Sequence, residues 1–195
     1  RLDQPSSSVT VGFVEGTKEP SVSKAPFYLA KHRSERIITV DGDLTDWPAA
    51  ACSSAGRALG PAVPCGRHGG ESIVLDNVKN IDYGTISNKD DLSATTAFLW
   101  DEEYLYVSAN VRDDELIAKR TVRYSYKDDL LELFMDLDGD GFRWKNTRDP
   151  QFGFSFDPKT KRPRLYNWGA AVEVPLNEAT KVAMEWKTDG YLIEA

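Results

Sequence analysis

The chain has 195 residues and a formal net charge of −7, with 41% hydrophobic and 28% charged residues. These values are ordinary for a globular protein, and the length accommodates one large β-domain with a substantial core. The acidic balance disfavours nucleic acid and anionic membrane surfaces as partners, and it is compatible with neutral sugars and divalent cations. No apolar run approaches the roughly 18 residues of a membrane-spanning helix, so the sequence predicts no membrane span.

The N-terminal part of the chain has weak hydrophobic periodicity. Residues 1–35, with scattered Ser, Pro and Lys, predict an arm or linker ahead of a domain over 36–195. The only cysteines, Cys52 and Cys65, lie in a small-residue loop at 49–70. With no His/Cys set at zinc spacing, they predict one disulfide that closes this loop, and two free thiols are the alternative. A disulfide predicts an extracellular, periplasmic or cell-surface location.

Short runs of alternating hydrophobicity predict strands along the rest of the chain. In the clearest run, residues 104–111, every second side chain from Leu105 to Val111 is apolar. The other runs cover 37–40, 72–75, 95–100, 129–137, 152–156, 182–186 and 191–195. Because turn residues separate the runs and no helix of ten or more residues stands out, the fold class predicted is all-β, an antiparallel β-sandwich of the immunoglobulin or jelly-roll type. The sequence stops inside its last run, so we expect the sandwich to lack its last strand or strands in this chain.

Four segments form an ordered set along the predicted domain. They are an Asp-Gly turn leading to Trp47, FLWDEEYLYV at 98–107 continuing to 114, DLLELFMD at 129–136, and GYLIEA at 190–195. Together they resemble carbohydrate-binding module family 9 and the related DOMON-like sandwiches. The likeness covers residues 37–195, apart from the cysteine-bearing insertion and the end after Ala195. The resemblance implies calcium sites and a cleft that holds a terminal sugar between two Trp rings.

The resemblance also implies a function. It points to a non-catalytic carbohydrate-binding domain of a secreted or surface protein, an accessory domain of a glycoside-active enzyme with further domains or a C-terminal segment. The sequence lacks the G-x-S-x-G, H-E-x-x-H and phosphate-loop motifs, which also disfavours catalysis. One alternative is a structural or interaction domain of a larger extracellular enzyme that does not bind sugar.

A second alternative is a haem b-binding DOMON-like cytochrome domain with a Met ligand. Met135 alternates with Leu131 and Leu133, as core residues do. Neither His32 nor His68 lies in a predicted strand, so haem is disfavoured.

The sharpest local motif is acidic. Asp136, Asp138 and Asp140 alternate before Gly141, as in the first half of an EF-hand loop, and such carboxylates can converge on Ca²⁺. Thr147 stands where an EF-hand carries its bidentate Glu, which excludes an EF-hand. We therefore expect a calcium loop of another type, with a tight hairpin turn as the alternative.

Two further acidic groups are less specific. Asp41, Asp43 and Asp46 favour a turn that caps the chain before Trp47. The segment 113–115 predicts a charged strand end, which would contribute to a cation site only if the fold brings it to another acidic loop.

Sugar binding needs exposed aromatic faces, because the C–H face of a pyranose ring is apolar and packs on a π-face. Trp47 and Trp100 lie in fold-defining segments, and Trp186 alternates with Val182 and Met184, so all three are predicted to be core.

The predicted ligand site draws on the remaining aromatics. Trp144 and Trp168 lie in polar surroundings and are the predicted platform, with Tyr126 and Arg123 beside it and Tyr124 in reserve. An ordinary half-buried aromatic is the alternative for each ring.

Overall fold

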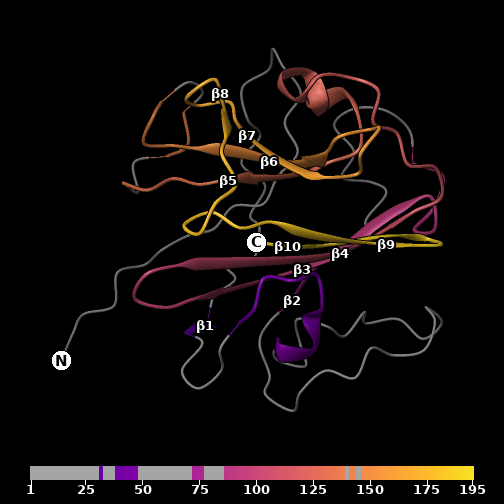
Figure 1. Ribbon diagram of the computed structural model, residues 1–195, viewed down its shortest axis with the longest axis horizontal. Coiled ribbons are helices and arrows are strands. Elements are labelled where there is room, and N and C mark those ends of the chain that lie inside the picture. The colour runs from indigo at the N-terminus through magenta and orange to yellow at the C-terminus, as the bar shows by residue number, and fades with distance from the viewer. Residues whose placement is uncertain (1–30, 33–37, 48–71, 77–85, 139–140, 144–145) are drawn as a thin grey trace.

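The computed structural model describes residues 31–32, 38–47, 72–76, 86–138, 141–143 and 146–195. Four residues with predicted roles, Cys52, Cys65, Asp140 and Trp144, lie outside the described residues. Within the described part of the chain, no helix is long and apolar enough to cross a membrane. Two β-sheets lie one above the other (Figure 1), so the predicted all-β sandwich is confirmed.

The lower sheet in Figure 1 has six strands, all antiparallel to their neighbours except β1. They are β1 (Lys31–His32), β2 (Ser72–Leu75), β3 (Leu92–Trp100), β4 (Leu105–Asp113), β9 (Ala183–Lys187) and β10 (Gly190–Glu194). The order is β1-β3-β4-β10-β9, and β2 also pairs with β3. The last strand of the chain therefore lies between β4 and β9 and is hydrogen-bonded on both sides.

The upper sheet is an antiparallel meander of four strands in chain order. They are β5 (Leu131–Phe134), β6 (Gln151–Phe156), β7 (Pro163–Asn167) and β8 (Val172–Val174). The 3-10 helix η2 (Val122–Lys127) packs against β6, β7 and β8. It lies on top of the upper sheet in Figure 1.

The main core lies between the sheets. Alternate residues of β4 and β10 point up toward alternate residues of β5, β6 and β7, as the period-two patterns require. Its buried members are Val107, Ala109, Val111, Leu133, Phe154, Leu165, Tyr191 and Ile193. Met135 and Trp186 pack against this core, in agreement with their predicted core roles, and Met184 also packs against it.

The other face of the six-stranded sheet is also buried, under residues 38–47. Ile38, Leu44 and Trp47 pack there in a second cluster with residues of β3, β4 and β10. A short 3-10 helix, η1 (Leu44–Asp46), shapes this segment, and the Asp43 side chain caps it by accepting the Thr45 N–H. The acidic residues around Gly42 thus serve a turn and a cap.

Glu194 at the end of β10 fixes this segment. Its carboxylate accepts the indole N–H of Trp47 at 2.7 Å and the backbone N–H groups of Asp41 and Gly42 at 2.9 and 2.8 Å. Glu194 and Trp47 are fully buried. Trp47 and Glu194 are 147 residues apart in sequence. Charge-assisted hydrogen bonds nevertheless join the Asp-Gly-Trp and GYLIEA segments into one structural unit.

Several sequence-based details were wrong. Residues 38–40 are not a strand, β5 is shorter than the predicted run, and β7, β8 and η2 were missed. Trp100 is not core: it is the last residue of β3, beside the turn into β4, and its side chain is 44% exposed. β1 lies inside the predicted N-terminal arm and pairs with residues 99–100 of β3.

Candidate functional site

Three aromatic residues meet on the outer side of the four-stranded sheet. Tyr124 and Tyr126 lie on η2, and each is 50% exposed. Trp168 follows directly after β7, and its ring centroid lies 6.3 Å from that of Tyr126 in an edge-to-face contact. We call these three residues the aromatic platform. Tyr124 and Tyr126 are exposed and Trp168 is half-buried, so the platform offers aromatic surface on which a sugar ring can stack.

Trp168 is held in place from below and from the side. Its indole N–H donates a 3.0 Å hydrogen bond to the backbone carbonyl of Arg123, which ties the ring to η2. Its ring also packs edge-on against Tyr166, with centroids 5.2 Å apart. Beneath the ring lies Gly153 in the middle of β6, where an added Cβ would come within 2.3 Å of two ring carbons. Glycine is therefore what lets the indole lie against the strand.

Polar side chains flank the ring on the same outer face of the sheet. Glu132 on β5 is opposite Gly153 in the ladder and accepts a 3.1 Å hydrogen bond from the Gln151 amide. Burial raises the pKa of Glu132. The Gln151 side-chain oxygen is buried, and no partner for it exists among the described residues. The half-buried Glu132 carboxylate, held by the buried Gln151, can accept a hydrogen bond from a sugar hydroxyl.

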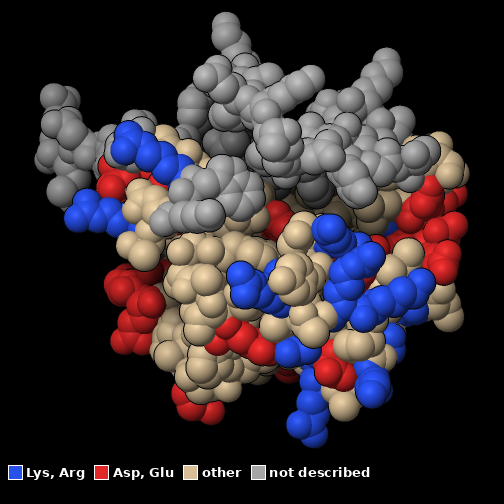
Figure 2. Space-filling view, turned by 90° about the horizontal axis from the view of Figure 1, so that it is seen from above, with Lys and Arg blue, Asp and Glu red and all other residues tan. Residues whose placement is uncertain are grey.

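A depression of about 530 Å³ adjoins the platform on the side of η2. It is lined by Lys119, Arg120, Thr121, Tyr124 and Lys127. Figure 2 shows the molecule from above, the side on which η2 lies, and Lys and Arg side chains gather in the middle and right of this view. The depression therefore combines one aromatic side chain with three cations.

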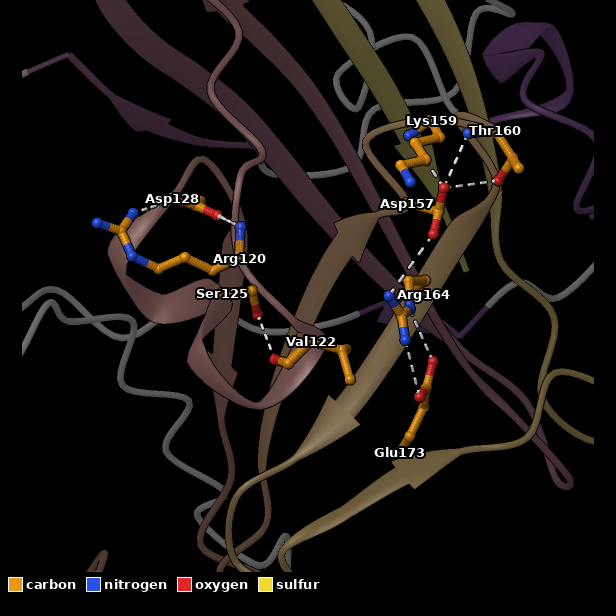
Figure 3. A network of polar contacts seen from close by, with 9 residues as sticks. All are labelled: Arg120, Val122, Ser125, Asp128, Asp157, Lys159, Thr160, Arg164 and Glu173. Carbon is orange, nitrogen blue, oxygen red and sulfur yellow. Dashed lines mark hydrogen bonds and ion pairs between the residues drawn. The ribbon is translucent and has the colours of Figure 1, made fainter.

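Hydrogen bonds within the segment 119–128 keep η2 in its shape (Figure 3). The Arg120 guanidinium binds the Asp128 carboxylate, whose other oxygen accepts the backbone N–H groups of Lys119 and Arg120. Burial works in the opposite direction, but these donors prevail and lower the pKa of Asp128. Within the helix, the Ser125 hydroxyl donates to the Val122 carbonyl at 2.7 Å.

A second set of ion pairs braces β7 and β8 (Figure 3). Arg164 donates two parallel hydrogen bonds to Glu173, at 2.8 and 3.0 Å, and lies 3.8 Å from Asp157. The bidentate geometry fixes the two strands against each other on the outer face that also carries Tyr166 and Trp168. The platform thus rests on a braced sheet.

The predicted calcium loop forms a cluster of carboxylates after β5. One carboxylate oxygen from each of Asp136, Asp138 and Asp149 lies within 4.8 Å of the others. Asp149 was missed by the sequence reasoning, and it lies two residues beyond Thr147, where an EF-hand would have its last ligand. The third carboxylate of the cluster therefore comes from a position two residues later than the EF-hand pattern places its last ligand.

The buried member, Asp149, fits a cation. Its Oδ2 accepts the Arg143 N–H at 2.8 Å and the Asn146 amide at 3.0 Å. Its Oδ1 has no hydrogen-bond partner among the described residues, and the whole side chain is buried. An unpaired buried carboxylate oxygen is costly, so a bound cation would satisfy it. Asp138 is the exposed member and lies 3.5 Å from Arg148.

The structure brings together part of the predicted ligand site. Trp168, Tyr126 and Arg123 meet at the platform, and Arg123 contributes its carbonyl to Trp168 and places its guanidinium 5.8 Å from the Tyr124 ring centroid. The reasoning missed Gly153 as the seat of the indole ring. A glycine between two strand phenylalanines was the available signal, since it marks a close approach.

Three curated proteins are similar to parts of the chain. Endo-1,4-beta-xylanase C of Paenibacillus barcinonensis is 33% identical over 102 residues, 52% of the chain and 8% of that protein. Exoglucanase XynX of Acetivibrio thermocellus is 33% identical over 72 residues, 37% of the chain and 6% of that protein. Endo-1,4-beta-xylanase A of Thermoanaerobacterium saccharolyticum is 32% identical over 85 residues, 43% of the chain and 7% of that protein. The matched part is thus less than a tenth of each relative.

A family model gives the wider match. It covers residues 73–195, which include β3 to β10, most of β2 and the whole aromatic platform. Because this is well over half of the chain, the protein belongs to the family described as carbohydrate family 9 binding domain-like.

Proposed function

We propose that this chain binds a saccharide on the aromatic platform, as a non-catalytic accessory module of a larger polysaccharide-degrading enzyme. Membership of a carbohydrate-binding family supports the ligand class. Three relatives whose names are those of xylanases and an exoglucanase, each matched over a small part of its length, support the accessory role. The observation that carries the location is the pair of exposed rings of Tyr124 and Tyr126 beside the half-buried Trp168, over a braced sheet.

In this proposal a pyranose ring stacks on the platform through its apolar face, while the half-buried Glu132 binds a hydroxyl group at its edge and Gln151 holds the Glu132 carboxylate. Stacking supplies most of the affinity because it removes apolar surface of both partners from water. The hydrogen bonds supply orientation, since they replace bonds to water that the sugar already had. Trp144 remains a predicted second ring for this site.

The binding test compares two tryptophans of different position. Trp168→Ala should weaken binding to xylo- or cello-oligosaccharides by at least about tenfold, which corresponds to about 1.4 kcal/mol of lost stacking. Trp100→Ala, which removes an exposed indole at the end of β3, is the matched control and should bind as the parent does. Isothermal titration calorimetry gives both affinities. If the parent chain binds no oligosaccharide of either series, the proposal fails.

We further propose that the cluster of Asp136, Asp138 and Asp149 holds a structural Ca²⁺. The proposal rests on the unpaired, buried Oδ1 of Asp149 and on three carboxylates that suit a hard cation. Asp140 remains a predicted fourth ligand. A cation here would join the chain after β5 to the chain before β6 and so neutralise like charges that otherwise repel one another.

Calcium should raise the melting temperature of the chelator-treated protein by about 5–10 °C at a concentration near one hundred times its dissociation constant. Asp149→Asn should abolish this rise, because it removes the negative charge of the buried ligand and replaces one carboxylate oxygen with an amide nitrogen. Asp114→Asn, at an exposed position after β4, is the control and should keep it. A parent protein whose melting temperature is the same in calcium and in chelator would contradict a structural ion.

An extracellular location is part of the same proposal. Xylan and glucan are polymers that an enzyme meets outside the cell, and the relatives named for them support this place of action. The predicted disulfide between Cys52 and Cys65 requires an oxidising compartment and stays a prediction. Peptide mass mapping with and without reduction would detect it.

A further inference from the structure

The depression beside the platform has a charge opposite to that of the whole chain. The protein carries a formal charge of −7, yet three cations and no acidic residue line this depression. Lys119 and Lys127 are exposed, and neither ammonium group forms an ion pair with any of the described residues. Arg120 is bound to Asp128, which holds its guanidinium at the site. A local positive field on an acidic protein favours an anionic ligand.

The depression and the platform share Tyr124. Its half-exposed ring lines the depression and lies 6.5 Å from the Tyr126 ring, centroid to centroid. Lys127 stands at the same border, with its Nζ 5.7 Å from the Tyr126 ring centroid. A ligand stacked on Tyr126 would therefore lie close to the Lys127 ammonium group and beside Tyr124, which lines the depression.

We propose that the platform and the depression together recognise an acidic saccharide, one that carries a carboxylate on a sugar ring, as in a uronic acid unit. This inference rests on the proposed sugar-binding function and adds the class of ligand. A uronic acid keeps the apolar ring face that stacks on tyrosine and adds a charge that lysine can pair with. The depression is shallow and open, and the half-exposed Tyr124 ring that lines it gives such a unit a stacking surface beside the two lysines.

The test compares two oligosaccharides of the same backbone and length, one neutral and one with a single uronic acid substituent. At low salt the acidic one should bind up to about fivefold more tightly, since an exposed charge pair contributes up to about 1 kcal/mol. This advantage should fall toward onefold at about 1 M NaCl, where the Debye length is near 3 Å.

A double variant identifies the groups responsible. Lys119→Gln with Lys127→Gln should remove the advantage of the acidic ligand while the folded state, measured by melting temperature, is kept. The control is Lys159→Gln with Lys181→Gln, which changes the net charge equally at exposed positions after β6 and before β9, and it should keep the advantage.

The outcomes separate the two proposals. Equal affinities for the acidic and the neutral ligand, or an advantage that survives the Lys119 and Lys127 changes, would overturn this inference and leave sugar binding intact. Binding of neither ligand would overturn the sugar-binding function and the inference with it.

Discussion

At the scale of single residues, the most unusual group is a pair of buried carboxyls, Asp113 and Asp129. Asp113 ends β4 and accepts the Glu115 N–H, and Asp129 lies just before β5. Burial and then the charge of Asp129 raise the pKa of Asp113 from 3.8 to about 6, and burial raises that of Asp129 too. The sequence predicted a charged strand end at 113–115, and the fold instead sets Asp113 against a second acidic residue. A cation or a shared proton relieves such a pair.

This pair predicts a stability that falls as the pH rises. Because the folded-state pKa of Asp113 is above its unfolded value, the native state binds the proton more tightly, and stability is lost as the pH rises from about 4 through 6. Asp113→Asn cannot ionise and should be about 1–2 kcal/mol more stable than the parent at pH 7.5 and equal to it near pH 3.5, in chelator. Urea denaturation at the two pH values measures this.

Asp114→Asn at the exposed neighbouring position is the control for that series, because the charge of Asp114 raises the pKa of Asp113 less than burial and the charge of Asp129 do, and this variant should keep most of the parent's pH dependence. A parent protein whose stability is flat between pH 4 and 7 would show that the pair does not titrate there.

At the scale of elements, the platform depends on a contact between a strand and a ring. The indole of Trp168 lies over β6 only because residue 153 has no side chain, and η2 holds the same ring through the Arg123 carbonyl. A strand, a helix of six residues and the residue after β7 thus build one binding surface.

Gly153→Ala should weaken sugar binding without a large loss of stability. The added methyl group meets the far edge of the indole, which can swing away, so we expect a change in stability of less than about 1.5 kcal/mol. The displaced ring should no longer stack on a sugar, and affinity should fall about tenfold or more. Ser155→Ala, at the next outward position of β6, should leave affinity unchanged. Unaltered binding by Gly153→Ala would show that the indole position does not matter.

At the scale of the whole molecule, the six-stranded sheet is buried on both faces. The second sheet covers one face, and residues 38–47 cover the other. This explains why both alternating sets of β4, including Tyr106 and Val107, are buried although an outer sheet face is usually wet. Residues 38–47 are therefore a layer of the core.

Trp47 and Trp100 were both predicted to be core, but their replacement by alanine should change the free energy of unfolding by different amounts. Trp47→Ala leaves a large cavity and an unpaired Glu194 oxygen, and should cost about 3–5 kcal/mol of unfolding free energy. Trp100→Ala removes an indole that is 44% exposed and should cost less than about 1 kcal/mol. Guanidinium chloride denaturation compares them, and similar losses would contradict the assigned roles.

Much of the strand pattern could be predicted because alternation is a local property. The runs at 72–75, 95–100, 104–111 and 152–156 correspond closely to β2, β3, β4 and β6. β7 and β8 lack such a pattern, since Arg164 and Glu173 form an ion pair on their outer face and their apolar residues are few. The segment 122–127 was missed because a 3-10 helix of six residues has no distinctive period.

The sequence by itself determined the all-β class, the family and the residue types suited to sugars and cations, because period-two alternation, ordered motifs and Asp spacing are readable along the chain. Only the tertiary structure decided which distant residues meet. It seated Trp168 on Gly153 and beside Tyr126, added Asp149 to Asp136 and Asp138, and joined Trp47 to Glu194. The physical reason is that these contacts are fixed by how strands pair and sheets pack, and neither is encoded within a single segment.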